Sequence, residues 1–66
     1  MKINNLTIGS WITLSQPAIA EIMSKSGYDW LCIDMEHSCI SKNEMTNLIS
    51  VIEANKCFAF VRVAKN

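Results

Sequence analysis

Apolar residues along the chain follow two different spacings, which predict three β-strands and two α-helices. Three short segments rich in apolar side chains are typical of strands: residues 8–14 (IGSWITL), 29–34 (DWLCID) and 57–63 (CFAFVRV). Between them, apolar residues recur every three or four positions, which is the period of a helix with one apolar face. The members of these two stripes are Ala18, Ile19, Ile22 and Met23 in the first helix and Met45, Leu48, Ile49 and Ile52 in the second.

The helix boundaries carry polar and turn-forming residues that start and stop helices. Ser15 can cap the first helix with its side-chain oxygen, and Pro17 is tolerated in the first turn. Gly27 is placed to end this helix in a left-handed turn. Residues 41–44 (SKNE) have the S-x-x-E form of a capping box at the start of the second helix, and Asn55 is a suitable stop. These signals predict the order β-α-β-α-β.

This order predicts an α/β fold with a parallel sheet. Short strands that alternate with helices are usually parallel and are joined by right-handed crossovers. Parallel sheets are normally buried on both faces, whereas three strands leave two open edges and too few helices to cover the sheet. The sequence also ends just after the third strand, where a third helix is expected. We therefore expect residues 1–66 to form a single partial domain, the beginning of a larger one.

Side chains alternate along a strand, so the predicted strands each have two distinct faces. In the second strand, Leu31 and Ile33 share one face and Asp34 lies on the other. If the aliphatic faces meet the helices, then Trp11, Asp34 and Arg62 all lie on the face away from the helices. Asp34 and Arg62 also lie near the carboxyl ends of their strands.

A cluster of ionisable residues is expected at these carboxyl ends. The segment IDMEHS places Asp34, Glu36 and His37 within four positions, and Arg62 ends the next strand. Ligands bind at the carboxyl ends of the strands in open α/β sheets and in β/α barrels. An imidazole, two carboxylates and a guanidinium at this edge indicate a site that handles an anion, although the D-x-E-H spacing is not specific by itself.

Each of these residues also has a structural interpretation without a function. His37 is then a loop histidine without a task, and Arg62 is a strand-end arginine that extends to solvent. Asp34 then bonds the backbone of the following loop, with a similar alternative for Glu36, and Trp11 is a core aromatic residue. The simplest role of Met23, Met35 and Met45 is packing, and that of Lys42 and Glu44 is the exposed start of a helix.

Composition and charge exclude several classes of protein. Half of the 66 residues are hydrophobic, which is more apolar surface than so short a chain buries unaided. The net charge is zero and the basic residues are scattered, which argues against nucleic-acid binding. No apolar run approaches the roughly 18–20 residues that span a bilayer, and the N-terminus lacks a signal-peptide pattern. We expect a cytoplasmic chain without a membrane partner.

The cysteines do not indicate a disulfide framework, because they are three in number and lack a C-x-x-C spacing. A zinc site can be written from Cys32, His37, Cys39 and Cys57, but this spacing fits no common zinc module. The simpler interpretation is that these cysteines are small apolar residues.

Several motifs in this order resemble the HpcH/HpaI aldolase family. They are G-x-W at residues 9–11, A-E-I at 20–22, G-Y-D-W at 27–30, I-D-x-E-H at 33–37 and V-R-V at 61–63. The resemblance covers almost the whole chain. It implies a (β/α)₈ TIM barrel of about 250 residues, of which this chain supplies the first three strands and two helices. It also implies a carbon–carbon lyase that cleaves a 4-hydroxy-2-oxo acid to pyruvate and an aldehyde through a metal-bound enolate.

The resemblance also implies roles for individual residues. His37 matches the acid/base histidine, and Arg62 matches the arginine that stabilises negative charge on pyruvate and on the developing oxyanion. Trp11 matches a tryptophan at the substrate pocket. Asp34 and Glu36 match signature acids with supporting roles, which orient the histidine or bond metal-bound water.

The family's divalent ion (Mg, Mn or Co) is bound by a glutamate and an aspartate from later strands, so no metal ligand is expected in these residues. We therefore expect the 66-residue chain alone to be inactive as an aldolase, and the longer protein to be a homo-oligomer. The alternative is a non-catalytic β/α remnant that associates with itself through its open sheet edges.

Overall fold

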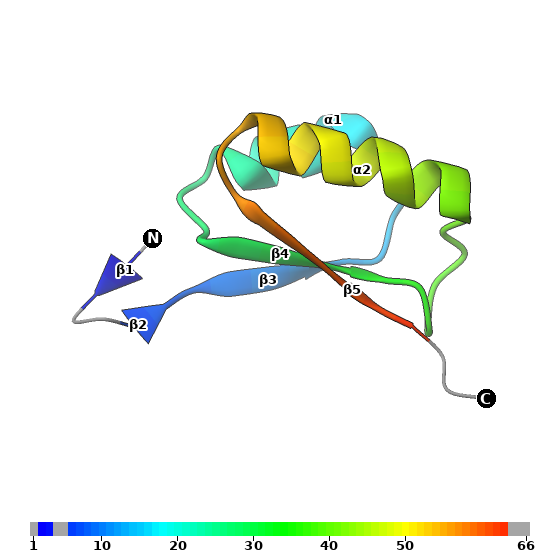
Figure 1. Cartoon of the computed structure of the whole chain (residues 1–66), viewed down its shortest axis with the longest axis horizontal. Coiled ribbons are helices and arrows are strands. Elements are labelled where there is room, and N and C mark those ends of the chain that lie inside the picture. The colour runs from blue at the N-terminus through cyan, green and yellow to red at the C-terminus, as the bar shows by residue number, and fades with distance from the viewer. Residues whose placement is uncertain (1, 4–5, 64–66) are drawn as a thin grey trace.

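The computed structural model describes residues 2–3 and 6–63 and confirms the β-α-β-α-β order, with one addition at the start (Figure 1). Two strands of two residues each come first, and the three longer strands alternate with the two helices. The elements are β1 (Lys2–Ile3), β2 (Leu6–Thr7), β3 (Gly9–Ile12), α1 (Pro17–Ser24), β4 (Trp30–Asp34), α2 (Lys42–Ala54) and β5 (Phe58–Arg62). The three long strands are one to three residues shorter than their predicted ranges.

The three longer strands form a parallel sheet in the order β3-β4-β5, as the sequence predicts. Ile12 of β3 lies opposite Ile33 of β4, which in turn lies opposite Val61 of β5. The antiparallel pair of β1 and β2 was not predicted. Each of these strands has only two residues, which is too short to show the alternation of side chains that identifies a strand in a sequence.

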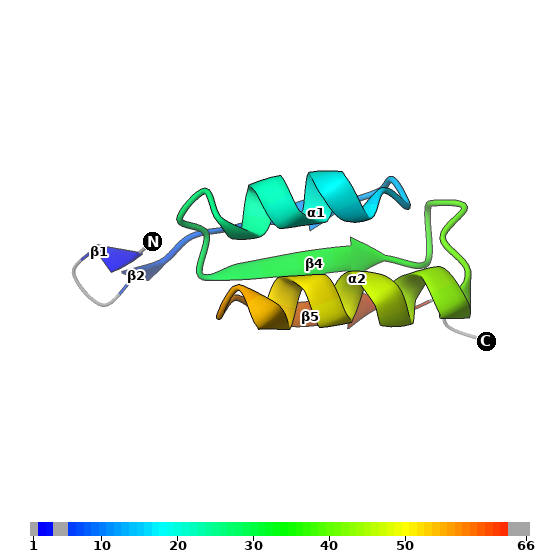
Figure 2. The same ribbon diagram turned by 90° about the horizontal axis from the view of Figure 1, so that it is seen from above.

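Both helices pack on one face of the sheet, and the core lies between the two layers (Figures 1 and 2). Leu31 and Ile33 point toward the helices and are fully buried, which confirms the predicted faces of β4. The three methionines predicted to pack are partly buried against this core. The most deeply buried side chains, at most 2 % exposed, are Ile12, Ala20, Leu31, Ile33, Leu48 and Ile52.

The predicted N-cap of α2 is confirmed, whereas the predicted N-cap of α1 is wrong by one residue. The Glu44 N–H donates to Ser41 Oγ at 3.2 Å, and the Ser41 N–H donates to Glu44 Oε1 at 2.8 Å, which completes the capping box. Gln16, not Ser15, is the cap of α1, and its side chain makes no capping bond. The reason is Pro17, since a residue before proline is held in an extended conformation and the helix begins at the proline itself.

The helix ends match the predicted stop signals, with a shift at α1. Asn55 is the C-cap of α2, as expected. Gly27 has a φ of 96° and is left-handed, but α1 ends earlier, with Lys25 as its C-cap. Lys56 has a φ of 59°, so a non-glycine residue makes the left-handed turn between α2 and β5.

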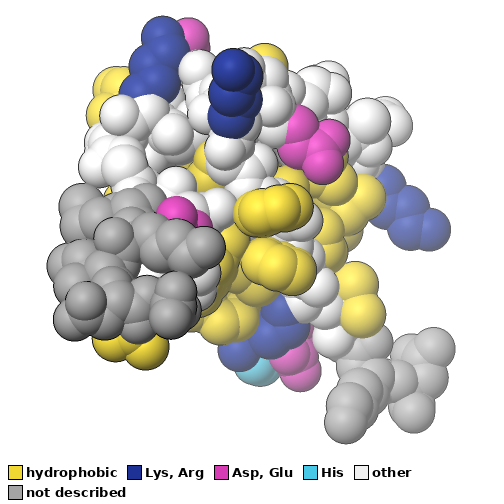
Figure 3. All heavy atoms as spheres, turned by 60° about the vertical axis from the view of Figure 1, so that its left-hand side comes forward, with side chains coloured by type: hydrophobic (Ala, Val, Ile, Leu, Met, Phe, Trp, Pro, Cys, Tyr) yellow, Lys and Arg dark blue, Asp and Glu magenta, His cyan; other side chains and the backbone are white. Residues whose placement is uncertain are grey.

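The sheet face away from the helices is uncovered by any described element, and its aromatic side chains are exposed. Trp11 is 46 % exposed and Phe60 54 % exposed, so the interpretation of Trp11 as a core residue is wrong. The rings of Trp30 and Phe60 pack edge to face with centroids 6.0 Å apart. Figure 3 shows hydrophobic side chains gathered on this part of the surface, beside a group of basic, acidic and histidine side chains. We call this surface the bare face. Neither described helix is long and apolar enough to cross a membrane.

Candidate functional site

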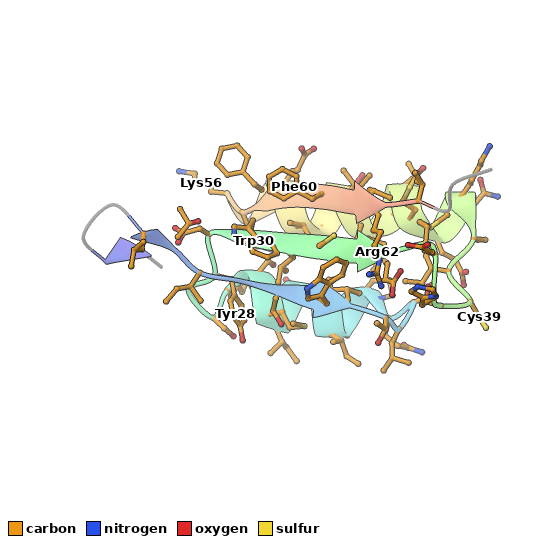
Figure 4. The ribbon with its side chains drawn as sticks, turned by 90° about the horizontal axis from the view of Figure 1, so that it is seen from below. Tyr28, Trp30, Cys39, Lys56, Phe60 and Arg62 are labelled. Atoms are coloured by element: carbon orange, nitrogen blue, oxygen red, sulfur yellow. The ribbon has the colours of Figure 1, made fainter. Side chains whose placement is uncertain are left out.

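The carboxyl ends of β4 and β5 bring Asp34 and Arg62 together. The two residues lie opposite each other in the parallel register, and both point to the bare face. The Met35 N–H donates to the Arg62 carbonyl oxygen at 2.9 Å, which extends the ladder past the end of β4. Figure 4 shows Arg62 at one end of this face, and Trp30 and Phe60 toward the other.

Asp34 and Arg62 form a bidentate ion pair. Arg62 Nη2 donates to Asp34 Oδ2 at 2.7 Å, and Arg62 Nε donates to Asp34 Oδ1 at 3.2 Å. Asp34 is only 3 % exposed, so its charge requires partners. The hydrogen bonds from Arg62 lower the pKa of Asp34 to about 2, with help from the backbone amides of His37 and Glu36, while Asp34 raises the pKa of Arg62. The structural interpretation expected Arg62 to extend to solvent. Its side chain is instead paired with Asp34.

Asp34 also organises the loop that carries His37. Its Oδ1 accepts hydrogen bonds from the backbone N–H of Glu36 at 3.0 Å and of His37 at 2.9 Å. The Ser38 hydroxyl donates to the Asp34 carbonyl oxygen and accepts from the Ile40 N–H. The expected bonding of Asp34 to the loop backbone is thus confirmed. The sequence analysis did not single out Ser38, although a serine just after a turn-forming aspartate is a usable signal.

Glu36 lies between the arginine and the histidine. Its Oε1 is 3.5 Å from Arg62 Nε and 3.8 Å from His37 Nε2. The His37 side chain is 67 % exposed, so the imidazole is open to a ligand from solvent. Of the two acids expected to orient His37, Asp34 binds its backbone and Glu36 lies nearest its ring.

Trp11 completes the group from the neighbouring strand. The Arg62 guanidinium carbon lies 4.5 Å from the centroid of the Trp11 ring, which is a cation–π contact. The structure therefore brings together all five residues that the sequence singled out, from β3, β4, β5 and the loop after β4. They form one continuous series of contacts: Trp11, Arg62, Asp34, Glu36 and His37.

The two larger of the described hollows lie at the sheet, and one of them adjoins this group. An open apolar groove of about 410 Å³ runs along the bare face and includes Trp11 and Cys32 in its lining. Burial raises the pKa of the Cys32 thiol, which lies two positions before Asp34 on the same face of β4. A larger hollow of about 610 Å³ lies at the opposite, amino ends of β4 and β5, beside Tyr28 and Lys56 (Figure 4).

The described residues do not form a binding site for a metal ion. Among residues 6–63 there is no group of three or more histidine, cysteine, aspartate or glutamate side chains that could hold one. Both carboxylate oxygens of Asp34 already accept hydrogen bonds. The zinc alternative finds no support, because Cys57 Sγ contacts the Tyr28 carbonyl oxygen at the amino end of the sheet, whereas His37 follows its carboxyl end.

Comparison with known proteins gives consistent matches. The sequence profile of the HpcH/HpaI aldolase/citrate lyase family matches residues 7–66. The chain is 42% identical over 57 residues to a 4-hydroxy-2-oxovalerate aldolase from Novosphingobium aromaticivorans, covering 85% of this chain and 22% of that protein. It is 39% identical over 54 residues to a hydroxypyruvate/pyruvate aldolase from Paraburkholderia phytofirmans, covering 82% of this chain and 21% of that protein.

Solved structures match the same region. The citrate synthase SbnG superposes with a TM-score of 0.84 at 33% identity, covering 88% of this chain and 24% of that one. An HpcH/HpaI aldolase from Desulfitobacterium hafniense superposes with a TM-score of 0.80 at 26% identity, covering 91% of this chain and 24% of that one. The chain thus spans about a quarter of the length of these relatives. Its parallel β-α-β-α-β unit corresponds to the N-terminal part of a (β/α)₈ barrel.

Proposed function

Because the chain belongs to the HpcH/HpaI aldolase/citrate lyase family, we propose that it contributes the anion-binding and proton-transfer half of a carbon–carbon lyase site. The substrate class is a 4-hydroxy-2-oxo acid, which is cleaved to pyruvate and an aldehyde. The observation that carries the proposal is the bidentate Asp34–Arg62 pair beside the loop of His37, at the strand ends where such folds bind ligands.

Arg62 acts as the binding group for negative charge. A guanidinium stays charged at any physiological pH and offers a planar set of donors that suits a carboxylate or an oxyanion. Asp34 uses Nε and one hydrogen of Nη2, so the donors of Nη1 remain for a ligand; Nη1 makes no hydrogen bond to any residue that the structure describes. The Trp11 ring covers one side of the guanidinium, 4.5 Å from its central carbon.

His37 acts as the acid/base residue. In aldol cleavage a base removes the proton of the 4-hydroxyl group as the neighbouring carbon–carbon bond breaks, and the same group returns a proton in the reverse reaction. An imidazole serves both steps near neutral pH. The His37 side chain is 67% exposed, and its Nε2 lies 3.8 Å from Glu36 Oε1.

The divalent ion that the family implies is not accommodated by these residues. The described carboxylates do not cluster into a cation site. Its ligands belong to other segments, and the proposal includes the expectation that the 66-residue chain alone does not cleave the substrate.

The experiment is a chimera in which residues 7–63 replace the matching quarter of the N. aromaticivorans aldolase. Pyruvate release from 4-hydroxy-2-oxovalerate, followed through lactate dehydrogenase, is expected for the chimera and not for the isolated chain. His37→Ala is expected to lower kcat by about 10²–10⁴-fold and Arg62→Ala by about 10²–10³-fold. Lys42→Ala, at the exposed start of α2, is the control and should not change the rate. A folded chimera that is inactive, or one indifferent to both substitutions, would refute the proposal.

The bare face favours a second candidate, a non-catalytic unit that associates with itself. Phe58 is 72 % exposed and Phe60 54 % exposed on this face, and β3 and β5 have unpaired edges among the described strands. Exposed aromatic surface and open edges promote association. Sedimentation of the isolated chain distinguishes this candidate from the lyase. A single species of monomer mass across a hundredfold range of concentration would exclude self-association.

A further inference from the structure

Asp34 occupies a position from which it can order two separate groups at once. One of its carboxylate oxygens, Oδ2, accepts from Arg62 Nη2 and from no other described residue. The other, Oδ1, accepts from Arg62 Nε and from the backbone N–H groups of Glu36 and His37. These donors come from β5 and from the loop after β4, and they do not otherwise share a hydrogen-bond acceptor among the described residues.

We infer that Asp34 is a positioning residue that couples Arg62 and the loop bearing His37 by anchoring both groups to one buried carboxylate. The inference rests on the proposed function only in giving this coupling a catalytic purpose. Asp34 does not face the substrate itself, because it is 3 % exposed and its oxygens are already occupied, whereas the Arg62 and His37 side chains are 40% and 67% exposed.

Burial is what gives this coupling its strength. A buried carboxylate without partners is costly, so loss of either set of donors leaves the remaining set with a stronger requirement to stay in place. The Trp11 ring also restrains the guanidinium, because its centroid lies 4.5 Å from the guanidinium carbon. The charge of Arg62 is therefore held at one position before any ligand arrives, which lowers the cost of ordering it on binding.

One substitution weakens the bonds from Arg62 (the arginine arm) and keeps the bonds from the loop amides (the loop arm). Asp34→Asn keeps a carbonyl oxygen that accepts from the loop amides and from Arg62 Nε, but it presents an NH₂ group to Arg62 Nη2, where two donors then meet. Asp34→Ala removes both arms. Arg62→Lys keeps a positive charge on β5 but lacks the planar set of donors, and it leaves Oδ1 free to accept from the loop.

The test is hydrogen exchange by NMR on the ligand-free chain, which requires no activity. We expect Asp34→Asn to speed exchange of the Arg62 Nη2 hydrogens at least tenfold, because their acceptor Oδ2 is replaced, while the Glu36 and His37 amides change less than threefold. Arg62→Lys should likewise preserve those amides, and Asp34→Ala should speed exchange of both sets. If Asp34→Ala does not fold, the loop arm is tested in the wild-type chain, where acidification through the pKa of Asp34 should deprotect the two amides. Unchanged exchange of the Arg62 Nη2 hydrogens in Asp34→Asn, or loop amides whose exchange does not change in Asp34→Ala, would overturn the inference.

Activity is a separate readout in the chimera described above. A misplaced binding group can cost about 10²-fold in rate, so Asp34→Asn is expected to lower kcat/KM by about that factor, mainly by raising KM for the 2-oxo acid. If the unsubstituted chimera is inactive while the exchange results hold, the proposed function fails and the coupling stands. If the chimera is active and Asp34→Asn does not change its rate, the coupling has no catalytic purpose and the proposed function stands.

Discussion

The ion pair between the buried Asp34 and the partly exposed Arg62 makes the stability of the protein depend on pH, in a window set by Asp34. Its pKa in the folded chain is about 2, against an ordinary value of 3.8, chiefly because Arg62 donates two hydrogen bonds to the charged form. A group whose pKa is lowered by folding stabilises the folded state where it is ionised in both states. This contribution is complete above the unfolded value of 3.8 and is lost as the pH falls through about 2.

The size of the effect can be expressed as protons taken up on unfolding. At about pH 2.9 the carboxyl group is about 0.9 protonated in the unfolded chain and about 0.1 in the folded chain, so unfolding binds about 0.8 proton at this residue. Asp34→Asn removes the group and should remove this uptake. Glu44 is a second acid with a lowered pKa, because of its bonds to Ser41, and its contribution remains in both proteins.

The assay is urea unfolding followed by circular dichroism at a series of pH values from 1.5 to 5. The slope of unfolding free energy against pH near 2.9 should be smaller in Asp34→Asn by the equivalent of about 0.8 proton. Glu53→Gln, an exposed acid near the end of α2, is the control for loss of a negative charge. Equal slopes in the wild type and in Asp34→Asn would refute the reasoning, because they would mean that Arg62 does not favour the charged form of Asp34.

Two further predictions concern the helix layer and use the same urea assay at neutral pH. Leu48→Ala should lower the free energy of unfolding by about 2–5 kcal/mol, because this side chain of α2 is fully buried. Leu14→Ala, at a residue 59 % exposed, is the control and should change it by less than about 0.5 kcal/mol. Equal costs would contradict the described core. Ser41→Ala should lower the free energy of unfolding by about 1 kcal/mol, because it removes the capping bond from the Glu44 N–H. The control is Ser50→Ala, which removes a hydroxyl that donates to the Thr46 carbonyl oxygen within α2 and should change stability by less than about 0.5 kcal/mol. A neutral Ser41→Ala would indicate that the capping box does not stabilise α2.

Local signals in the sequence were sufficient for the order and type of the main elements. The three-to-four spacing of Leu48 and Ile52 and the alternation of Leu31 and Ile33 follow from the repeat of each backbone conformation, so they can be read without the fold. The capping box at residues 41–44 is equally local, since its partners are three residues apart. The alternation also predicted that Trp11, Asp34 and Arg62 share a face, and the structure confirms that they do.

Other features depended on contacts between distant segments. Trp11 looked like a core residue because a tryptophan is usually buried, but no described element covers its side of the sheet. The cap of α1 moved from Ser15 to Gln16 because Pro17 fixes where the helix begins. The pairing of β1 with β2 joins strands too short to show an alternating pattern.

The amino-acid sequence by itself therefore determined the parallel β-α-β-α-β unit and the residues that reach its carboxyl edge, because both follow from short-range periodicity and strand direction. Only the tertiary structure decided how these residues are bonded. Asp34 and Arg62 are 28 positions apart, and their bidentate pairing depends on the register of β4 against β5. That register brings the apolar face of each strand against both helices, and it joins segments that are far apart in the sequence.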